Sequence, residues 1–511
     1  MSRVRATMKN SAVSIVIQMV TISVNFISRT VLIKTLGEQY LGISGLFSNI
    51  LNMLSLAELG IGTTITYWLY QPMANNDEKR LSVLMSVYAK IYNILGIVVL
   101  TLGLSLAPFL SFFMKETPDI PYLTLIYVLS VLNMASSYFF VYKSTLINVA
   151  QKNYIINVTK FLFYFVNSII QIAILIFTKN YILYSMVGIV SSVTGNITVS
   201  IIAERMFPFL KNKVDGRLTR EEKSEIKKDV SAIFSHNIGS FVLTSTDNMV
   251  ISKFIGVIEV GLYSNYTMII HAVQTLLNLI FGSLSSSVGN LINSVSKEKS
   301  YEVFKNVFFA TCWLVGFCSV CLYILFNPFI TLWLGADYVF DDYVVFFIVL
   351  NFYLMFIRRP ANTFKHCAGL FRNDKFKPFI ESFINLVTSI LLVKKMGIGG
   401  VFIGTAVSTI LACLYVEPHI LYKYFYKRNV LEYFKLLLKY FAITVLSAIV
   451  IKLFSMPVGK VTYVGFIYLF VLCMIIPNGL FWLFFRKTSE MLYFKTMLEK
   501  IVHKFIKKTV A

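Results

Sequence analysis

The sequence of 511 residues is poor in charge, and above all in acidic charge. Only 14% of its residues are charged, whereas soluble globular proteins carry about 25%, which excludes an ordinary soluble domain. Lysine and arginine number 47 against 25 aspartates and glutamates, giving a formal net charge of +22. The basic residues lie in short clusters between apolar runs instead of forming stripes on a hydrophilic surface, which argues against a nucleic-acid partner. An aromatic content of 15% excludes a disordered chain.

Signatures of several enzyme and carrier classes are missing as well. The sequence has no G-x4-GK[ST] phosphate loop, so ATP hydrolysis by this chain is not expected. Residues 71–80, QPMANNDEKR, lack the glycine-rich basic signature of a major-facilitator carrier. The six cysteines lie in or beside apolar runs and form no disulfide pattern. No convincing pair of carboxylates or acidic metal-binding motif is present, so we expect no enzyme, no metal site and no cofactor.

What the sequence has in abundance is long apolar runs. Hydrophobic residues make up 57% of the chain, and its mean hydropathy is +0.72. A membrane-crossing helix needs about 20 apolar residues, and about fourteen segments meet this requirement. We therefore predict an all-α, polytopic membrane protein. The predicted spans are residues 11–33, 42–70, 81–113, 121–148, 155–177, 181–204, 230–253, 258–291, 303–326, 343–370, 378–394, 398–421, 434–455 and 461–485.

Lysine and arginine separate unequally between alternate loops. Most of them fall into the loops on the side of the N-terminus, and few lie on the other side. Cytoplasmic loops carry such an excess, so both termini are predicted to be cytoplasmic, as an even number of spans requires. A bias toward lysine, isoleucine and asparagine suggests an AT-rich bacterial genome.

A ladder of polar residues follows one helical face of the first span. Its members are three or four residues apart, and lipid offers them no hydrogen-bond partners, so this face should look toward protein or water. A constant shift, the one that takes Gly42 to Gly261, aligns part of the ladder with polar residues of the seventh span. It also aligns Gly37 with Gly256. The ladder consists of Ser11, Ser14, Gln18, Thr21, Asn25 and Ser28, and the last four align with Asn237, Ser240, Thr244 and Asp247.

This repeat predicts an internally duplicated transporter with two pseudo-symmetric halves. Each half has six spans, an even number, so the halves should be parallel repeats about an axis along the membrane normal, with the substrate pathway between them. The alternative is coincidence, because Ser, Thr and Asn also join helices in membranes. The predicted parts are an N-terminal six-helix half (1–206), a cytoplasmic linker (207–229), a C-terminal six-helix half (230–424), two additional transmembrane helices (425–485) and a basic amphipathic cytoplasmic tail (486–511).

Several ionisable residues lie inside the predicted spans, where a charge is costly and usually faces a cavity or a partner. Pro360 should kink the tenth span beside two arginines. Guanidinium and ammonium groups around a cavity suit phosphate or diphosphate, although the lysines have the alternative of reaching the membrane interface. The basic residues concerned are Arg29, Arg358, Arg359, Lys365 and Lys90.

Two acidic residues inside the spans have two interpretations each. Glu58 is a candidate counter-ion for Lys90, and the alternative is a part in proton or sodium coupling. Asp247 either couples ions or neutralises an arginine of the cavity. For Glu58, structural pairing is the simpler of the two hypotheses.

The sequence resembles the oligosaccharide and polysaccharide repeat-unit flippases of the multidrug/oligosaccharidyl-lipid/polysaccharide exporter superfamily. The resemblance rests on LSLAELGIGTTITYWLYQ (54–71), AQKNYIIN (150–157) and STDNMVISKFIGVIEVGLYSNY (245–266), and their order extends it over about residues 5–425. It implies transport of an undecaprenyl-diphosphate-linked oligosaccharide from the inner to the outer leaflet for capsule, O-antigen or exopolysaccharide synthesis. It further implies a multi-pass protein of the bacterial cytoplasmic (inner) membrane, with membrane lipids and a polysaccharide polymerase as partners.

In such relatives a cationic central cavity takes the glycan and the diphosphate. By position, Arg29, Arg358 and Arg359, with Lys365 and Lys90, are the diphosphate candidates in this chain. A cation-coupled multidrug exporter of the same superfamily is the first alternative, and its cavity should be acidic. A membrane enzyme acting on lipid-linked sugars and a non-transporting scaffold are the others. The glycan candidates are Gln18, Asn25, Asn237 and Thr244.

Overall fold

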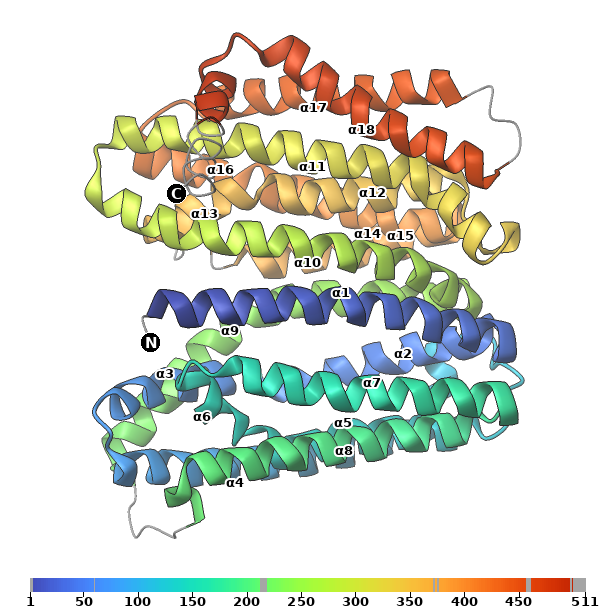
Figure 1. The fold of residues 1–511 in the computed structure, drawn as a ribbon, viewed down its shortest axis with the longest axis vertical. Helices are drawn as coiled ribbons and strands as arrows, with labels where there is room; N and C mark the ends of the chain where they lie inside the picture. The colour runs from blue at the N-terminus through green and yellow to red at the C-terminus, as the bar shows by residue number, and fades with distance from the viewer. Residues whose placement is uncertain are drawn as a thin grey trace, which may run out of the picture. The chain divides into compact units, whose positions relative to one another are not determined.

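The computed structural model describes residues 3–58, 60–211, 218–370, 373–374, 376–455, 461–496 and 499. Within these ranges the chain is helical and contains no strand, and Figure 1 labels its helices. Ten helical segments there are long and apolar enough to cross a membrane. The prediction of an all-α, polytopic membrane protein is confirmed. Contacts divide the chain into two compact units, Met1–Ser264 (unit 1) and Asn265–Ala511 (unit 2).

Each of the fourteen predicted spans coincides with one helix or with consecutive helices, and the breaks have local causes. The span 42–70 consists of α2 (Glu38–Leu54) and α3 (Ile61–Ala74). Between them Gly60 adopts a left-handed φ of 89°, where a Cβ atom would lie 2.8 Å from the Val230 carbonyl oxygen, so only glycine fits.

The predicted kink in the tenth span is present. Helix α12 (Asp342–Ile357) ends just before α13 (Arg359–Cys367), and Pro360 stands in the first turn of α13. Proline is tolerated in a first turn because the amide that it lacks would have no helical partner there.

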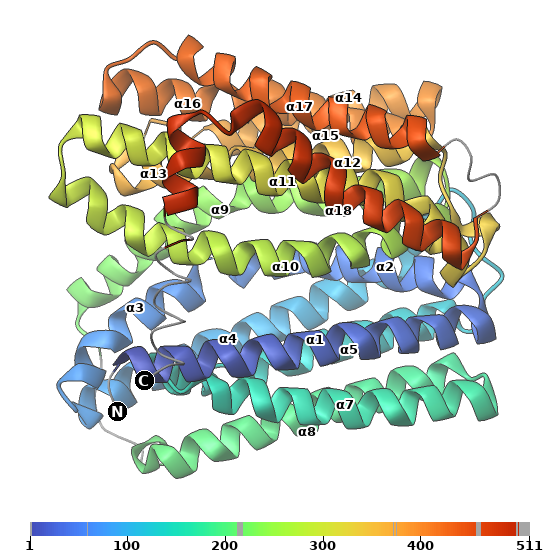
Figure 2. The same cartoon turned by 45° about the horizontal axis from the view of Figure 1, so that its top comes forward.

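Unit 1 packs its helices in neighbouring pairs, which Figures 1 and 2 show from two directions. Helix α1 runs along α7, α7 and α5 both pack on α8, and α4 packs on α5. Its core contains the buried rings of Phe47 and Tyr127, 5.1 Å apart and edge to face. The helices not yet bounded are α1 (Arg3–Leu36), α4 (Glu78–Leu106), α5 (Leu123–Val141), α6 (Ser144–Val149), α7 (Asn153–Thr178), α8 (Tyr181–Met206) and α9 (Arg220–Phe254).

The N-terminal turns of α9 are anchored to unit 1 outside the membrane-spanning part. Thr219 and Glu222 form a capping box, as their spacing in the sequence predicts. The hydrogen bond from the Thr219 amide and the ion pair with Arg80 lower the pKa of Glu222. Trp68 donates an indole hydrogen bond of 3.1 Å to Asp229. The predicted linker 207–229 therefore ends in a helix that is fixed to its neighbours.

The start of α10 (Val257–Ser294) crosses α2 at two glycines. A Cβ atom on Gly42 would lie 2.0 Å from the Val257 carbonyl oxygen, and one on Gly261 would lie 2.8 Å from the Glu38 carbonyl oxygen. The repeat shift takes Glu38 to Val257 and Gly42 to Gly261, so the two contacts are the same contact made twice. A local twofold relation produces such reciprocity, and the internal repeat itself stays a prediction.

The contacts place the division of the chain inside α10 and not at the linker. Helix α9, the predicted start of the second half, packs on α2 and α3 of unit 1. The first turns of α10 pack on α2 through Gly42 and Gly261. The predicted halves, 1–206 and 230–424, are defined by the sequence repeat, and the boundary between them stays a prediction. The two compact units are defined by packing contacts.

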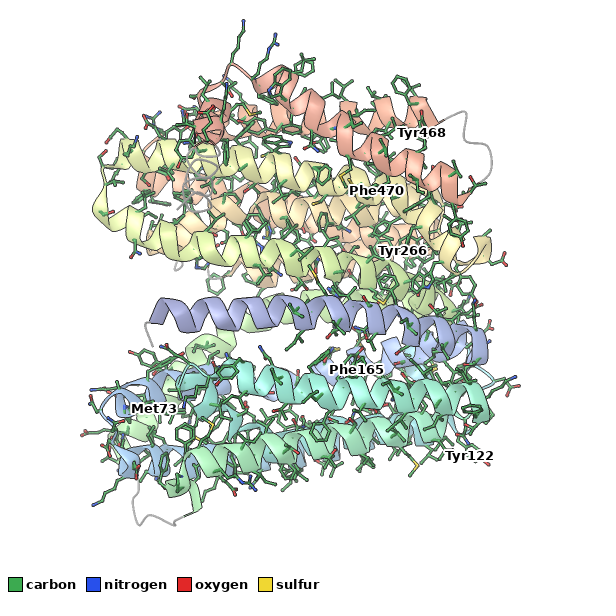
Figure 3. The ribbon with its side chains drawn as sticks, viewed as in Figure 1. Met73, Tyr122, Phe165, Tyr266, Tyr468 and Phe470 are labelled. Carbon is green, nitrogen blue, oxygen red and sulfur yellow. The ribbon has the colours of Figure 1, made fainter. Side chains whose placement is uncertain are left out.

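Unit 2 is built around α11, against which α12, α17 and α18 pack, while α14 pairs with α15. Figure 3 labels Tyr266, which is fully buried and stacks on Phe340 with ring centres 5.2 Å apart. The two additional spans predicted within 425–485 are α17 and α18. Of the predicted amphipathic tail, 497, 498 and 500–511 lie outside the described residues. The remaining helices are α11 (Lys297–Trp333), α14 (Lys377–Met396), α15 (Ile398–Thr409), α16 (Val416–Ile420), α17 (Leu431–Ser455) and α18 (Tyr463–Phe485).

Candidate functional site

The polar ladder of α1 is held partly by protein. Gln18, Thr21 and Ser28 are half-buried, whereas Asn25 is exposed and its side-chain oxygen accepts a hydrogen bond of 2.6 Å from the Tyr164 hydroxyl of α7. The side chains of Ser11 and Ser14 lie outside the described part of the chain. A polar face that is partly satisfied and partly open suits a surface that contacts water or a polar ligand.

The matching ladder of α9 is described only at its end. The side chains of Asn237, Ser240 and Thr244 lie outside the described residues, so the arrangement of the two ladders across a pathway stays a prediction. Asp247 is half-buried and interacts electrostatically with Tyr263 in the first turns of α10.

Arg29 lies one turn beyond Asn25 and binds the beginning of α10. Its guanidinium donates hydrogen bonds to the carbonyl oxygen of Ser264, at 2.7 Å, and to the Ser264 hydroxyl. A guanidinium has five N–H donors, so most of them remain for other acceptors. Arg29 therefore ties α1 to α10 and still presents positive charge.

Glu58 is held by tyrosines and not by Lys90. It lies at the break between α2 and α3, where it accepts a hydrogen bond from the Tyr92 hydroxyl and interacts with that of Tyr138. Lys90 is exposed, and no ion pair joins these two described residues. The hypothesis that Glu58 pairs with Lys90 is therefore wrong. Tyr92, two residues after Lys90 and on a different face of the helix, is the residue that points toward the carboxylate.

The deep cations of unit 2 form a network with carboxylates that the sequence analysis did not single out. Arg358 donates a hydrogen bond of 3.0 Å to Glu417 of α16, a fully buried carboxylate that also pairs with Lys377. Lys377 lies 3.4 Å from Asp374, and Asp374 in turn pairs with Lys365. Three cations thus share two carboxylates.

Two expectations for these residues change. Lys365 is fully buried and pairs with Asp374, so its ammonium group is held by protein and is not exposed at a membrane surface. Arg358 gives part of its donor capacity to Glu417, so it is not a free cation. Glu417 was detectable in the sequence, because a carboxylate in the apolar segment ILACLYVEPHI of the twelfth span requires a partner.

Arg359 differs from the other deep basic residues of unit 2 in its contacts. Its guanidinium lies over the ring of Phe356 at 5.5 Å from the centre, and the side chain is half-buried. Among the described residues it makes no ion pair. A stacked guanidinium keeps its in-plane N–H donors available for an anion.

A second polar cluster joins α14 to α15. Asn385 donates a hydrogen bond of 2.9 Å to Thr405, and the Thr409 hydroxyl lies 3.4 Å from Glu381. Glu381 and Asn385 are almost fully buried. These groups bind one another inside unit 2, although the side-chain oxygen of Asn385 is buried without a hydrogen-bond partner. The hydropathy of the span gives no sign of them.

Comparison with known proteins gives matches at the level of structure. No family model and no curated protein matches the sequence. The lipid II flippase MurJ, in an inward closed conformation, superposes with a TM-score of 0.63 at 15% identity, over 94% of this chain and 99% of that chain. The chain has the fold of this flippase.

Multidrug transporters share the fold over less of the chain. An inward-facing multidrug resistance MATE transporter of the MOP superfamily has a TM-score of 0.60 at 14% identity, covering 78% of this chain and 94% of its own. A Vibrio cholerae MATE transporter has a TM-score of 0.55 at 12% identity, with 83% and 98% covered. The match to the flippase leaves only a small part of this chain uncovered. That part is shorter than the segment from the start of α17 to the C-terminus, so the match includes some of this segment.

Proposed function

We propose that this chain is a flippase that moves an undecaprenyl-diphosphate-linked oligosaccharide from the inner to the outer leaflet of the bacterial cytoplasmic membrane by alternating access. The product would enter the synthesis of a surface polysaccharide such as capsule, O-antigen or exopolysaccharide. The chain itself acts as a transporter and not as an enzyme.

The observation that carries the proposal is the extent of the likeness to a lipid flippase. The match to lipid II flippase covers 94% of the chain, so it must include part of the segment that contains α17 and α18. The matches to the two MATE transporters cover only 78% and 83% of the chain. The two last helices therefore favour a lipid-linked substrate over a drug.

The charges of the deep residues also support an anionic substrate. Arg359 makes no ion pair within the described chain, and Arg29 keeps N–H donors beyond those bound to Ser264. A diphosphate entering the membrane needs such cations, since its charge is otherwise uncompensated in a low-dielectric space. Arg358 and Lys365 would take part only after exchanging their carboxylate partners for the diphosphate.

The alternative is a cation-coupled multidrug exporter. It is favoured by the shared MATE fold and by Glu58, a carboxylate whose partners are tyrosine hydroxyls and not a cation. Such a carboxylate has no cation among its described partners and could bind a cationic substrate or a coupling ion.

The deciding experiment removes the gene from its host. We expect loss of the surface glycan and accumulation of the lipid-linked oligosaccharide in the inner leaflet, with unchanged resistance to cationic drugs. The leaflet can be read from the access of a membrane-impermeant lectin to the glycan in right-side-out and inverted vesicles. Normal surface glycan together with hypersensitivity to cationic drugs would establish the alternative and contradict the proposal.

A further inference from the structure

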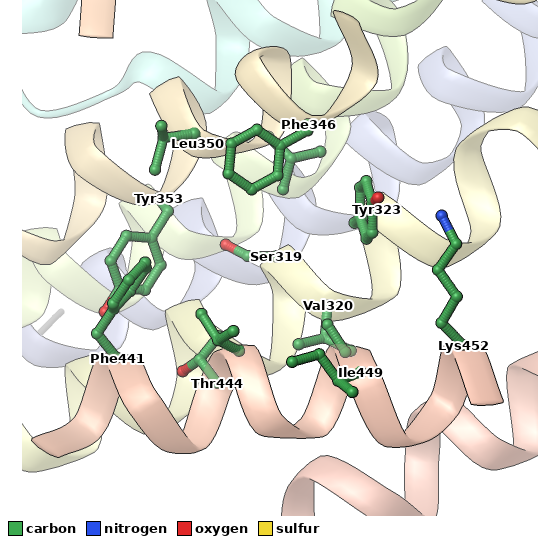
Figure 4. Close-up of a pocket in the computed structure, with 13 residues that line it drawn as sticks. Ser319, Val320, Tyr323, Phe346, Leu350, Tyr353, Phe441, Thr444, Ile449 and Lys452 are labelled. Carbon is green, nitrogen blue, oxygen red and sulfur yellow. The ribbon is translucent and has the colours of Figure 1, made fainter. Parts of the chain in front are cut away.

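Unit 2 contains a groove between α11, α12 and α17, which Figure 4 shows. Its inner wall consists of buried side chains, among them Val320, Tyr353 and Thr444, and its rim of exposed ones, such as Phe346 and Ile449. The groove has a volume of about 240 Å³, and its lining is almost entirely apolar. A narrow apolar groove that opens onto a membrane-facing surface suits a hydrocarbon chain.

A second chamber, which has a partly polar lining and is called the polar chamber below, adjoins one end of the groove. This chamber has a volume of about 270 Å³ and shares Tyr323 and Lys452 with the groove. Its other lining residues include Asn327, Asp342 and Ser455. The two chambers together form one amphipathic site, apolar in its depth and polar at its mouth, which we call the amphipathic groove.

The length of the apolar part matches one leaflet of a membrane. It extends along α17 from Phe441 to Lys452, and a helix rises 1.5 Å per residue, so the distance is about 16 Å. Half of a hydrocarbon core of about 30 Å is about 15 Å. Lys452 stands one turn from the end of α17, on the side that the charge distribution predicts to be extracytoplasmic. With this orientation the groove spans the outer leaflet.

The mouth of the groove presents one charge of each sign. The Lys452 ammonium lies 2.8 Å from an Asp342 carboxylate oxygen and 5.6 Å from the centre of the Tyr323 ring. Both side chains of this pair are more than half exposed. The ammonium has three donors, so donors remain for a phosphate, while the carboxylate remains open to a cation and repels a second anion.

The polar chamber is held in shape by a hydrogen-bond network. The Tyr266 hydroxyl donates to the Asn327 side-chain oxygen at 2.7 Å and accepts from the Phe340 amide at 2.8 Å. Asn327 in turn donates to the Phe340 carbonyl oxygen at 2.9 Å. A site whose walls are fixed in advance loses less entropy when a ligand binds.

We propose that the amphipathic groove binds a resident zwitterionic phospholipid of the outer leaflet, with an acyl chain between α11, α12 and α17, its phosphate at Lys452 and its ammonium at Asp342. Phosphatidylethanolamine has this chemistry. The paired charges at the mouth favour it over an anionic lipid, whose headgroup would meet the Asp342 carboxylate. The inference concerns a bound lipid that is not transported, and it does not rest on the proposed substrate.

The test is native mass spectrometry of the full chain in detergent with equal amounts of phosphatidylethanolamine and phosphatidylglycerol. We expect one phosphatidylethanolamine to stay bound under activation that strips other lipids. Lys452→Gln should lower its occupancy about tenfold, because a hydrogen bond to a charged group contributes about 1.5–3 kcal/mol. Lys452→Arg should retain it. Asp342→Asn should remove the preference against phosphatidylglycerol.

Matched variants separate the groove from the rest of the surface. Leu350→Trp fills the apolar chamber and should abolish retention, whereas Ile475→Trp, on an exposed face of α18, should not. Lys395→Gln removes an exposed lysine outside the groove and should also have no effect. The Lys452 and Asp342 variants should unfold at the wild-type temperature, because exposed ion pairs contribute only about 0–1 kcal/mol. The unfolding temperatures of the two tryptophan variants show that they are folded. Equal retention of lipid by Leu350→Trp, or tighter binding of phosphatidylglycerol by the wild-type chain, would overturn the proposal.

Discussion

Glu58 in unit 1 and Glu417 in unit 2 are both carboxylates inside the membrane, but their surroundings differ. Glu58 accepts a hydrogen bond from the hydroxyl of Tyr92 and lies beside Tyr138. Glu417 is fully buried and pairs with Arg358 and Lys377. The partners of Glu58 are neutral hydroxyls, whereas Glu417 lies between two cations. Within the described residues, unit 1 thus holds a carboxylate without a cationic partner, and unit 2 holds one that fixes the positions of cations.

The largest effect is expected from Glu417→Gln. This change leaves Arg358 and Lys377 near a neutral amide, and breaking a buried ion pair by removing one partner costs about 3–5 kcal/mol. We expect the abundance and the thermal unfolding temperature of the variant to fall sharply. Lys377 still has Asp374 at 3.4 Å, so adding Arg358→Gln should restore much of the loss. A fully stable single variant would show that Glu417 does not hold the network.

The next effect concerns transport and not stability. Arg359 makes no ion pair within the described chain, so Arg359→Ala should leave the unfolding temperature unchanged. If Arg359 grips a diphosphate, the alanine variant should lose surface glycan about tenfold or more, and Arg359→Lys should restore it only in part, because lysine lacks the planar fork. Surface glycan at matched protein level is the measurement.

The control for Arg359 is Arg205→Ala, which removes an exposed arginine near the end of α8. Wild-type export by Arg359→Ala would remove this residue from the diphosphate site. Equal losses in both variants would point to net charge instead of a local contact.

A smaller effect on stability is expected at Glu58. Glu58→Gln keeps an oxygen that accepts from Tyr92, so the free energy of unfolding should change by less than about 1 kcal/mol. Glu58→Ala leaves the hydroxyl unpaired and should cost about 1–3 kcal/mol. If Glu58 couples a proton or a cation, Glu58→Gln should lose the dependence of transport on the ion gradient, measured in vesicles. An unchanged dependence would make the role of Glu58 purely structural.

The smallest effect is expected at the ladder of α1. Tyr164→Phe removes the hydrogen bond to Asn25, an exposed contact that should contribute about 0.5–1.5 kcal/mol. If Asn25 binds glycan, freeing it from Tyr164 should leave export intact, whereas Asn25→Ala should reduce it. Similar export by the two variants would exclude Asn25 from glycan binding.

The fold was largely predictable, because hydropathy and helical periodicity act over whole segments. The kink at Pro360 and the capping box at Thr219 were also predictable, since each follows from neighbouring residues alone. The partners of the deep charges were not, because they depend on which helices meet. Lys90 and Tyr92 are two residues apart, and only packing decides that Tyr92 turns toward Glu58. Glu417 is far from Arg358 in the sequence, and their ion pair exists because α13 and α16 come together.

The crossing of α2 and α10 bears on how such a chain can arise. Gly42 faces Val257 while Gly261 faces Glu38. If the predicted repeat arose by duplication, a six-helix ancestor would have met its own copy through this same patch, as the subunits of a symmetric homodimer do. In that ancestor one substitution would have altered both sides of the contact together. Once both copies belong to one gene, each side can vary alone, and Glu38 and Val257 already differ in charge. On the predicted duplication, the two glycines would keep the inherited geometry, and the unlike residues opposite them would reflect the divergence that gene fusion permits.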